Sequence, residues 1–542
     1  MRDVDHHLIE NSLQTGQWPA TEGEGSFGVN SFGVKMTAHL RLGVGILLVL
    51  ATSWLGALRA QGARAALDQY VASHQGAIVS ELVDLVSIPN IAADTENIRR
   101  NAVLLRNMLR RRSFSTDILE TDGNPLVWGE LKVPGAKRTL LIWAHYNGQS
   151  IDSKGWKQAN PFVPVLRAGR LEDSAKEIPG FRTLDKFDPN WRLYARSAAD
   201  DKAPIVALLA ALDGLKASGL APSSNVRVVL DGEAGSPSLA AAIPRYRDKL
   251  TADVMILLEG PVHQSGHPTI AFGARGFLDL DLTVYGPKVG VNSGNYGNWV
   301  PNPALGLAHL LASMKDDAGR VLVKGFYDGI GPLSPQEQAM LEAVPDDPAS
   351  LMKLFVIAAP ERSDLSLQQA LQLPALNIRG LSSAFVGPDA RTIIPDRAEA
   401  FIDVRLVKET PAKAMTEKLL AHIRAQGFHV VQSEPDDETR RRYPRIVKAI
   451  FRGASEGYRT SPLAPESQLV TEAVTRMLGE RPIQIRTMGQ RINIAEFVEV
   501  MGIPAITLPT VNFDNNQTAE NENLRLGHLF TGIITIAAVL TM

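Results

Sequence analysis

Three short apolar runs, each followed at once by a polar side chain, constrain the fold of this chain more than any other feature. The runs and the residues that follow them are 139–144 with His145, 225–230 with Asp231, and 253–258 with Glu259. A helical pattern at 203–215 lies between the first two runs, with Pro204 in its first turn, where proline is tolerated. Strands that alternate with helices in this way predict an α/β fold with a mostly parallel sheet and covered faces.

The polar residues at the ends of these runs predict one functional site. In open α/β sheets, ligands bind beyond the carboxyl ends of the strands. Asp200 precedes the helical pattern and Glu233 follows the second run, so we expect both to lie near His145 and Glu259. One such histidine or glutamate alone is more often structural, but four in this order indicate a site. A hydrolytic zinc site needs imidazole and carboxylate ligands, an open position for water, and a base.

A second sequence texture begins near residue 275. Apolar and polar side chains alternate at 278–284 and at 402–406, which is typical of half-exposed antiparallel strands. Between these strands, helical spacing is found at 303–315 and 334–344. We therefore predict a separate α+β domain at 275–430, inserted into the α/β domain. The α/β texture then returns, with a strand at 505–508.

Composition limits both the chemistry and the partners. The 542 residues are enough for two or more domains with their own cores. The sequence has no cysteine, so disulfides, zinc–thiolate sites and cysteine nucleophiles are excluded, and His, Asp and Glu must hold any metal. A net charge of −2 gives no support for binding nucleic acid or an acidic membrane surface.

The N-terminal region contains an export signal by its pattern. Residues 42–58 are apolar, Arg41 precedes them, and small residues lead up to Ala60. This pattern predicts a secretory signal peptide at 36–60, cleaved after Ala60, and therefore a periplasmic or extracellular protein. The alternative is an uncleaved membrane anchor, although the apolar run is short for a full span.

The start of the chain and its end bear on the same prediction. Residues 1–35 are polar and rich in glycine, which no export signal needs, so Met36 is a plausible alternative start to Met1. No stable membrane span is expected after cleavage. The apolar stretch 533–542 is too short to cross a membrane and predicts a core helix.

Taken in order, these motifs resemble the co-catalytic zinc peptidases of family M20, which includes carnosinase, carboxypeptidase G, aminoacylase and succinyl-diaminopimelate desuccinylase. Further matching runs lie at 156–164, 272–276, 296–303, 391–395, 404–407 and 521–525. The resemblance extends from about residue 68 to the end of the chain. It implies a metallopeptidase-type hydrolase that cleaves amide bonds in small peptides or N-acyl amino acids. It also implies a catalytic domain at 61–274 and 431–542, a lid or dimerisation domain at 275–430, and a homodimer.

By this resemblance, the metal ligands divide into two sets. One metal takes His145, Asp200 and Glu259, and all three are present. The other takes Asp200, Glu233 and a last histidine, which is replaced by Thr518, a poor neutral ligand for zinc. We therefore expect one zinc per chain, where the family has two. Near the first ligand, Asn147 stands where the family has the aspartate that orients the histidine, although its amide can still accept a hydrogen bond.

The catalytic positions depart further from the family. Gly232 falls at the position of the general base, and Asn292 at that of the histidine in the oxyanion site. Losing a base costs about 10²–10⁴-fold and losing an oxyanion donor about 10²–10³-fold. The reading is therefore a hydrolase with an eroded site, unless Asp231 or another carboxylate substitutes as base. The alternative is a pseudoenzyme that binds peptides or serves as a dimeric scaffold.

Three other positions concern the substrate. Arg405 and Asn302 resemble substrate-contacting positions in the lid, but both could equally be structural. The glycine-rich substrate loop is altered at 489–493.

One competing motif, the G-x-S-x-G pattern at 453–457, lacks the helix that a serine-hydrolase elbow needs after it, so we interpret it as a chance match.

Overall fold

The computed structural model describes residues 38–234, 237–492 and 494–542, with side chains from residue 61 onward except at 153, 201 and 237. The chain divides into two compact units, Met1–Gly56 and Ala57–Met542, and the second contains both sheets and the candidate site. The side chains of the predicted signal at 36–60 lie outside the described residues. Among the residues that are described, no helix is long and apolar enough to cross a membrane.

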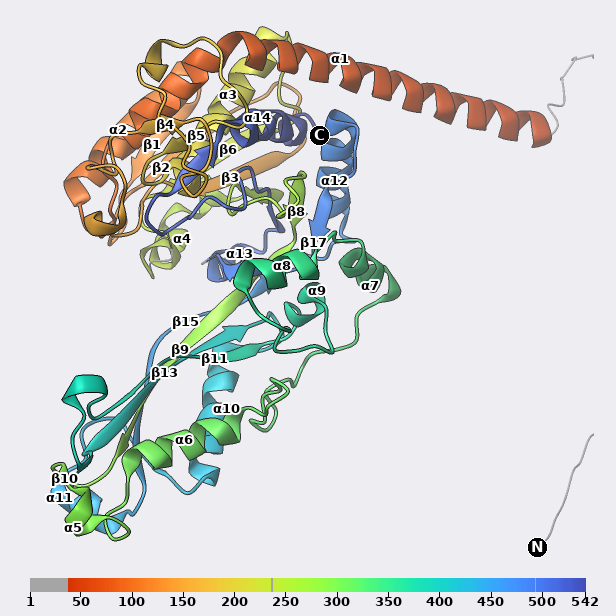
Figure 1. Ribbon diagram of the computed structural model, residues 1–542. Coiled ribbons are helices and arrows are strands. Elements are labelled where there is room, and N and C mark those ends of the chain that lie inside the picture. The colour runs from red at the N-terminus through yellow and green to blue at the C-terminus, as the bar shows by residue number, and fades with distance from the viewer. Residues whose placement is uncertain (1–37, 235–236, 493) are drawn as a thin grey trace, which may run out of the picture. The chain divides into compact units, whose positions relative to one another are not determined.

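An eight-stranded sheet forms the larger body of the second unit (Figure 1), in the order β1-β2-β6-β3-β7-β19-β8-β17. Its strands are β1 Ser115–Leu119, β2 Leu126–Leu131, β3 Thr139–His145, β6 Asn225–Asp231, β7 Val254–Leu257, β8 Thr269–Ala271, β17 Ile483–Ile485 and β19 Ala505–Thr507. The central strands β6, β3, β7 and β19 pair in parallel with one another. Strand β2 is antiparallel to both β1 and β6, and β19 is antiparallel to β8, which pairs in parallel with β17. The mostly parallel sheet predicted from the apolar runs is confirmed.

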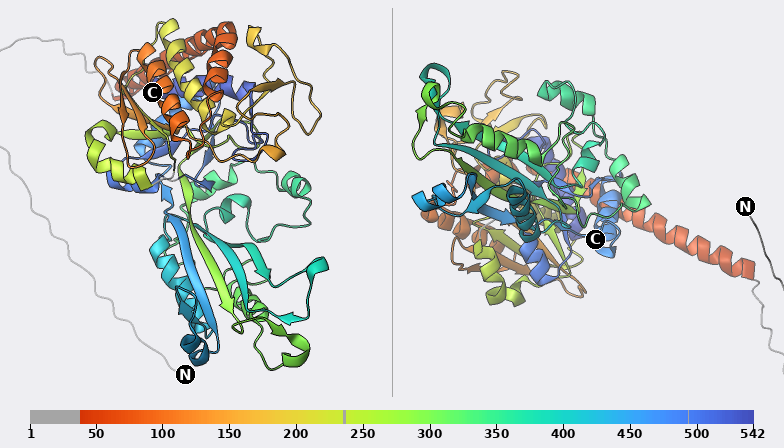
Figure 2. Two further views of the ribbon diagram at one scale, coloured as in Figure 1. Left: turned by 90° about the vertical axis from the view of Figure 1, so that its left-hand side faces the viewer. Right: turned by 90° about the horizontal axis from the view of Figure 1, so that it is seen from below.

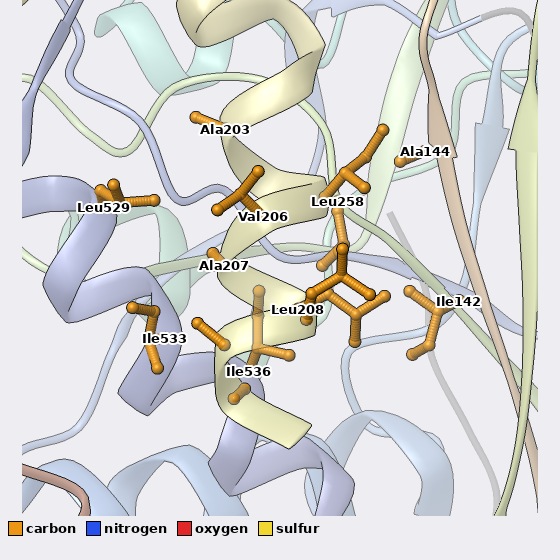
Figure 3. Close-up of a cluster of buried hydrophobic side chains, with 14 of the residues drawn as sticks. Ile142, Ala144, Ala203, Val206, Ala207, Leu208, Leu258, Leu529, Ile533 and Ile536 are labelled. Atoms are coloured by element: carbon orange, nitrogen blue, oxygen red, sulfur yellow. The ribbon is translucent and has the colours of Figure 1, made fainter. Parts of the chain in front are cut away.

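Helices cover both faces of this sheet because successive side chains of each strand point to opposite faces. Along β3, Leu140 and Ile142 join the core under α1 (Ala38–Val86), α2 (Thr95–Arg111), α3 (Ala203–Ala217) and α14 (Leu526–Leu540). Leu141 and Trp143 join the opposite core with α4 (Pro237–Leu250) and α13 (Ala495–Met501). Figure 3 shows α3 between the sheet and α14, with Val206 on α3, Ile142 on the sheet and Ile533 on α14. The predicted core helix at 533–542 is thus confirmed as part of α14.

The inserted segment forms a second sheet around the long strand β9 (Gly273–Tyr285). Its order is β11-β13-β9-β15-β14, with β16 and β18 also paired to β9. The other strands are β11 Ala375–Ser383, β13 Arg397–Leu406, β14 His429–Val431, β15 Ile446–Ser455, β16 Tyr458–Arg459 and β18 Met488–Arg491. Both β13 and β15 are antiparallel to β9, as the alternating pattern predicts (Figure 2). Leu280 and Leu282 pack under α6 (Pro303–Met314) and α10 (Ala412–Ala425).

The inserted sheet continues beyond the predicted boundary at residue 430. Strands β14 and β15 belong to the inserted sheet, because β14 pairs with β15 and Ile446–Ser455 pairs along β9. The inserted sheet therefore extends to Ser455. The motif at 453–457 bridges β15 and β16 rather than a strand and a helix, which agrees with the rejection of a serine-hydrolase elbow.

The remaining elements are short. They are β4 Val165–Arg167, β5 Arg192–Tyr194, β10 Val291–Asn292, β12 Ile393–Ile394, β20 Asn523–Arg525, α5 Ser293–Tyr296, α7 Pro335–Glu342, α8 Pro348–Phe355, α9 Leu367–Ala370, α11 Asp437–Arg442 and α12 Pro465–Leu478. A three-stranded sheet pairs β5 with β4 and β20. It brings the C-terminal segment close to the turn that precedes α3 and carries Asp200.

Candidate metal centre

The carboxyl ends of β3 and β7 bring three predicted ligands together. His145 ends β3, Glu259 follows the neighbouring parallel strand β7, and Asp200 lies in the π-helical turn that precedes α3. His145 Nε2 is 3.4 Å from Asp200 Oδ1 and 3.5 Å from Glu259 Oε2. The three ligand atoms all lie within 4.8 Å of one another.

This donor set fits a divalent cation. Zinc binds nitrogen and oxygen at about 2.0–2.2 Å in a tetrahedron, whose edges are then roughly 3.4 Å long. The observed separations of 3.4 and 3.5 Å match such an edge. Burial raises the pKa of Glu259 to about 7; His145 opposes this rise and Asp200 adds to it. A cation would favour the ionised form of these crowded carboxylates.

The orientation of His145 comes from the backbone. Its Nδ1 lies 3.1 Å from the carbonyl oxygen of Asn147, which can accept a hydrogen bond from a protonated Nδ1 and leave Nε2 as the ligand atom. The side-chain oxygen of Asn147 instead accepts a hydrogen bond from the backbone N–H of Ala234 at 3.0 Å. Among the described contacts, the imidazole of His145 is therefore oriented by the backbone carbonyl of Asn147 rather than by its amide side chain.

A residue that the sequence analysis overlooked holds Asp200 in place. Glu522 is buried, and its Oε1 accepts hydrogen bonds from the backbone N–H groups of Ala199 and Asp200 at 3.0 and 2.9 Å. Its Oε2 accepts from the N–H of Ser197 at 2.9 Å and from Arg196 at 3.0 Å. Glu522 lies in the matching run 521–525, so a search for acidic residues within matching runs could have found it.

Glu233 lies outside the group of three ligand atoms. Its Oε2 accepts a hydrogen bond from the backbone N–H of Asn124 at 3.1 Å, in the turn before β2. Gly123 packs so closely on this carboxylate that an added Cβ would lie 1.9 Å from Oε2. Because the turn at 123–124 already holds this carboxylate, the role of Glu233 as a ligand remains a prediction.

The position predicted for the base has no room for a side chain. A Cβ on Gly232 would lie 2.5 Å from the hydroxyl of Tyr146 and 2.8 Å from the carbonyl oxygen of Pro125. Asp231, the suggested substitute, is 2 % exposed, and burial raises its pKa to about 6. Asp231 is not among the residues that line the adjoining cavity.

A cavity of about 790 Å³ extends from the three ligands to the inserted sheet. Arg275, Arg379, Arg405 and Arg491 line this cavity, and the role of Arg405 as a substrate contact stays a prediction. Arg405 pairs with Asp403 at 2.9 Å and Arg379 with Asp279 at 3.4 Å. Among the described residues, Arg275 and Arg491 form no ion pair, which leaves two guanidinium groups for an anion. The altered loop at 489–492 also lines the cavity.

Asn302, predicted as a substrate contact in the lid, and Asn292, at the position of the lost oxyanion histidine, do not line this cavity. Asn302 is exposed and caps α6, with its side chain accepting from the N–H of Ala304 at 2.9 Å. Asn292 is exposed and caps α5 through the N–H of Asn295 at 3.1 Å. In this chain both act as helix caps, and the structure brings neither to the candidate metal centre.

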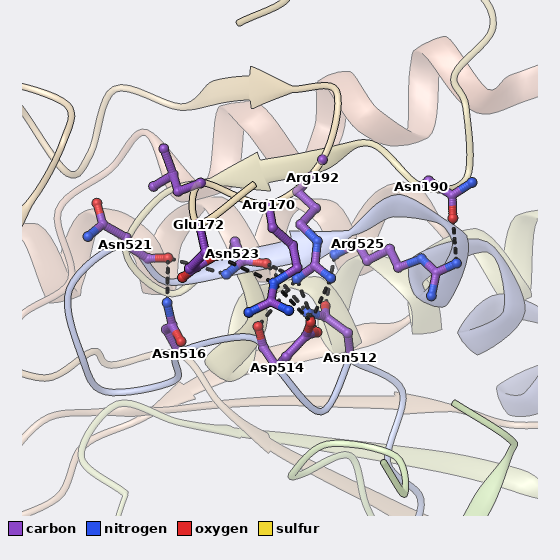
Figure 4. Close-up of polar contacts among 12 residues, drawn as sticks. Arg170, Glu172, Asn190, Arg192, Asn512, Asp514, Asn516, Asn521, Asn523 and Arg525 are labelled. Atoms are coloured by element: carbon purple, nitrogen blue, oxygen red, sulfur yellow. Dashed lines mark hydrogen bonds and ion pairs between the residues drawn. The ribbon is translucent and has the colours of Figure 1, made fainter. Parts of the chain in front are cut away.

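Thr518, at the position of the missing histidine, lies in a loop anchored by an arginine (Figure 4). Arg192 on β5 pairs with Asp514 at 2.7 Å and donates to the side chain of Asn523 at 2.8 Å. Burial alone would raise the pKa of Asp514, but hydrogen bonds from Arg192 and Asn512 lower it to about 2. Thr518 lines the cavity with a φ of 64°, a value that β-branched residues rarely adopt.

Comparisons with known proteins agree with this geometry. Residues 182–542 match the model of peptidase family M20/M25/M40. The Cys-Gly metallodipeptidase DUG1 of Candida albicans is 22% identical over 490 residues, covering 85% of this chain and 93% of the relative. The human Beta-Ala-His dipeptidase is 23% identical over 506 residues, covering 87% and 90%.

Solved structures give the same result for the fold. The M20 family metallo-carboxypeptidase Sso-CP2 from Sulfolobus solfataricus has a TM-score of 0.69 at 27% identity, with 85% of this chain and 98% of that chain covered. The dipeptidase Dug1p from Saccharomyces cerevisiae has a TM-score of 0.68 at 19% identity, with 88% and 98% covered.

Proposed function

The chain belongs to peptidase family M20/M25/M40, and on this basis we propose that it is a metal-dependent hydrolase of amide bonds in small peptides or N-acyl amino acids. The observation that carries the proposal is the group of His145, Asp200 and Glu259, which opens into a polar cavity. The relatives named as dipeptidases support a short substrate.

Two groups of residues would bind the cation and the substrate carboxylate. His145, Asp200 and Glu259 would hold the cation, which when bound polarises a carbonyl group and lowers the pKa of water. Arg275 and Arg491 face the same cavity without acidic partners among the described residues, so they would bind the free carboxylate of the substrate. Between these two groups, the amide bond of a small substrate would lie beside the metal ligands.

We propose one zinc per chain. A second cation would need Asp200, Glu233 and Thr518, but the carboxylate of Glu233 accepts a hydrogen bond from Asn124. Threonine adds only a neutral hydroxyl. Because no side chain fits at position 232, the site also lacks the expected base. We expect a rate about 10²–10⁴-fold below that of a family member with this base.

The second candidate function is a catalytically inactive family member that binds peptides or forms a dimeric scaffold. Two observations favour it. No side chain fits at Gly232, the position of the base, and Asn292, at the position of the oxyanion histidine, caps α5. The cavity with its arginines would still bind a peptide carboxylate.

Metal content distinguishes these functions. Zinc per chain is measured by mass spectrometry on protein purified without chelator, in the wild type, in His145→Ala, and in His309→Ala, an exposed histidine on α6. We expect one zinc in the wild type and in His309→Ala, and none in His145→Ala. A panel of dipeptides and N-acyl amino acids is then assayed. Absence of metal even with zinc supplied would refute the hydrolase, and two zincs would refute the single site.

We further propose that the protein is exported, because residues 36–60 have the pattern of a cleaved signal. N-terminal sequencing of the mature protein is expected to start at Gln61. A start upstream of residue 42 would contradict cleavage.

A homodimer is proposed through the inserted sheet, whose edge strand β11 exposes Ile378 and Leu381. Light scattering during size-exclusion chromatography is expected to give twice the chain mass. A single chain mass at micromolar concentration would contradict this assembly.

A further inference from the structure

A second cavity lies against the candidate metal centre and differs from it in chemistry. It has a volume of about 400 Å³, within the range of about 300–1,000 Å³ typical of small-molecule sites. Most of its lining is apolar and comes from α8, α9 and β11, including Leu351, Met352, Phe355 and Leu376. Lys315, Glu361 and Arg362 also line it, but Lys315 pairs with Glu361 and Arg362 with Asp364. Figure 1 shows α8 and α9 in the inserted segment, near the start of β9.

The two cavities meet at two side chains, because Arg275 and Leu371 line both. Arg275 donates through Nη2 to the carbonyl oxygens of Ala370, at 3.0 Å, and Leu373, and so fixes the segment between them. Leu371 packs on Gly489, where an added Cβ would lie 3.0 Å from its Cδ2. The apolar cavity therefore begins on the arginine side of the polar cavity, away from the metal ligands.

Arg275 is an incompletely paired cation at this junction. Its residue is 8 % exposed, its Nε has no hydrogen-bond partner among the described residues, and it forms no ion pair there. A buried guanidinium with an open donor favours a carboxylate. In a peptide or N-acyl amino acid, the carboxylate and the side chain of the last residue are bonded to the same carbon. A carboxylate on Arg275 thus places that side chain at the mouth of the apolar cavity.

We propose that the apolar cavity is the subsite for the side chain of the carboxylate-bearing residue, and that the protein selects substrates whose last residue is bulky and apolar. This inference rests on the proposed function, since it deepens the same site. The cavity walls supply the dispersion contacts and exclude water, and Arg275 sets the register of the ligand. A small polar side chain would bury less apolar surface there than a bulky apolar one.

Equilibrium binding tests this subsite without requiring turnover. Dissociation constants of N-acetyl-L-phenylalanine and N-acetyl-L-serine are measured by calorimetry on the zinc-supplied full chain. We expect the phenylalanine ligand to bind at least about tenfold more tightly, from burial of its ring. Equal affinities would overturn the proposal.

Two variants on one helix supply the matched comparison. Met352→Trp fills the cavity, whereas Leu354→Trp makes a similar change at an exposed position of α8 outside its lining. Met352→Trp should bring the affinity for the phenylalanine ligand down to that for the serine ligand, and Leu354→Trp should leave it unchanged. An equal loss in both variants would overturn the proposal. If Met352→Trp does not fold by circular dichroism, Phe355→Ala, in the cavity lining, should weaken only the phenylalanine ligand, by about threefold or more.

Three further outcomes separate this inference from its premise. If N-octanoylglycine binds in a Met352-dependent manner and N-acetylphenylalanine does not, the cavity accepts the acyl side and the proposed assignment is wrong. If the phenylalanine ligand binds as expected but no substrate is hydrolysed, the subsite stands and the hydrolase fails. Hydrolysis at equal kcat/KM for phenylalanine and serine substrates would leave the hydrolase and overturn the subsite.

Discussion

At the scale of single residues, the candidate metal centre depends on side chains whose hydrogen bonds fix the positions of its ligands. Glu522 accepts hydrogen bonds from three backbone N–H groups of the turn that carries Asp200, and one more from the guanidinium of Arg196. Each ligand in such a site needs partners that fix its position. The chain meets that need with a buried carboxylate more than 300 residues away in sequence.

Glu522→Gln tests this positioning role. An amide can accept at only one of its two polar atoms, so the turn at 197–200 should loosen, and zinc affinity should fall by about 10–100-fold. The measurement is a zinc dissociation constant by competition with a chromogenic chelator. Glu520→Gln, an exposed neighbour in the same loop, is the control, and an equal effect in both variants would contradict the role.

The glycine at position 232 gives a second prediction at this scale. Because a Cβ there would meet Tyr146 and the carbonyl of Pro125, Gly232→Ala should lower the free energy of unfolding by about 1–3 kcal/mol. Gly331→Ala, where nothing lies within 4 Å, should be close to neutral. Denaturant unfolding of both variants measures the difference. Full stability of Gly232→Ala would mean that this turn can accommodate a side chain.

At the scale of elements, short helices connect the inserted segment to the loops that line the cavity. Helix α7 begins with a capping box in which Ser334 and Glu337 satisfy each other's backbone N–H groups. Glu337 also accepts a hydrogen bond from Arg486 at 2.8 Å, just before the loop at 489–492. One carboxylate thus caps a helix and ties it to the strand region that leads into the candidate site.

The pH dependence of stability should report this contact. Burial alone would raise the pKa of Glu337, but Arg486 and Ser334 lower it to about 2, below its unfolded value of about 4.3. A lowered folded pKa gives stability that is present above the unfolded pKa and lost as pH falls through the folded value. Glu337→Gln should therefore lower the free energy of unfolding by about 2 kcal/mol at pH 7.

The difference should shrink as the pH falls from about 4 toward 2, because the wild-type carboxyl is then protonated as well. Urea unfolding of the wild type and the variant at several pH values in this window measures it. Glu342→Gln, on the exposed face of α7, is the control and should show no such trend. A difference that stays constant with pH would contradict the contact with Arg486.

At the scale of the whole molecule, metal binding and folding should be coupled. The three ligands come from β3, β7 and the turn before α3, so the unfolded chain does not hold them together. Zinc at one hundred times its dissociation constant should then stabilise the folded state by about 2.7 kcal/mol. Chelation should lower the melting temperature of the wild type, and His145→Ala should melt at one temperature with or without zinc. A chelator effect of the same size in that variant would place the metal elsewhere.

Much of the fold was readable because it depends on local patterns. The runs that end at His145 and Asp231 became β3 and β6 almost residue for residue, because a buried parallel strand needs a continuous apolar run. The family resemblance was also confirmed. The sequence did not show that the inserted sheet continues past residue 430, because β15 joins it by pairing with β9, about 170 residues earlier, and no local pattern specifies such pairing.

The sequence by itself determined the fold class, the family and the grouping of His145, Asp200 and Glu259 at one edge of a sheet, because strand ends and chain order fix these features. Only the tertiary structure decided which side chains hold these ligands in position and which predicted ligand lies outside the group. It placed Glu522 behind Asp200, turned Glu233 toward Asn124, and put an apolar cavity beside Arg275. These depend on contacts between segments far apart in the chain, whose distances and packing no local pattern specifies.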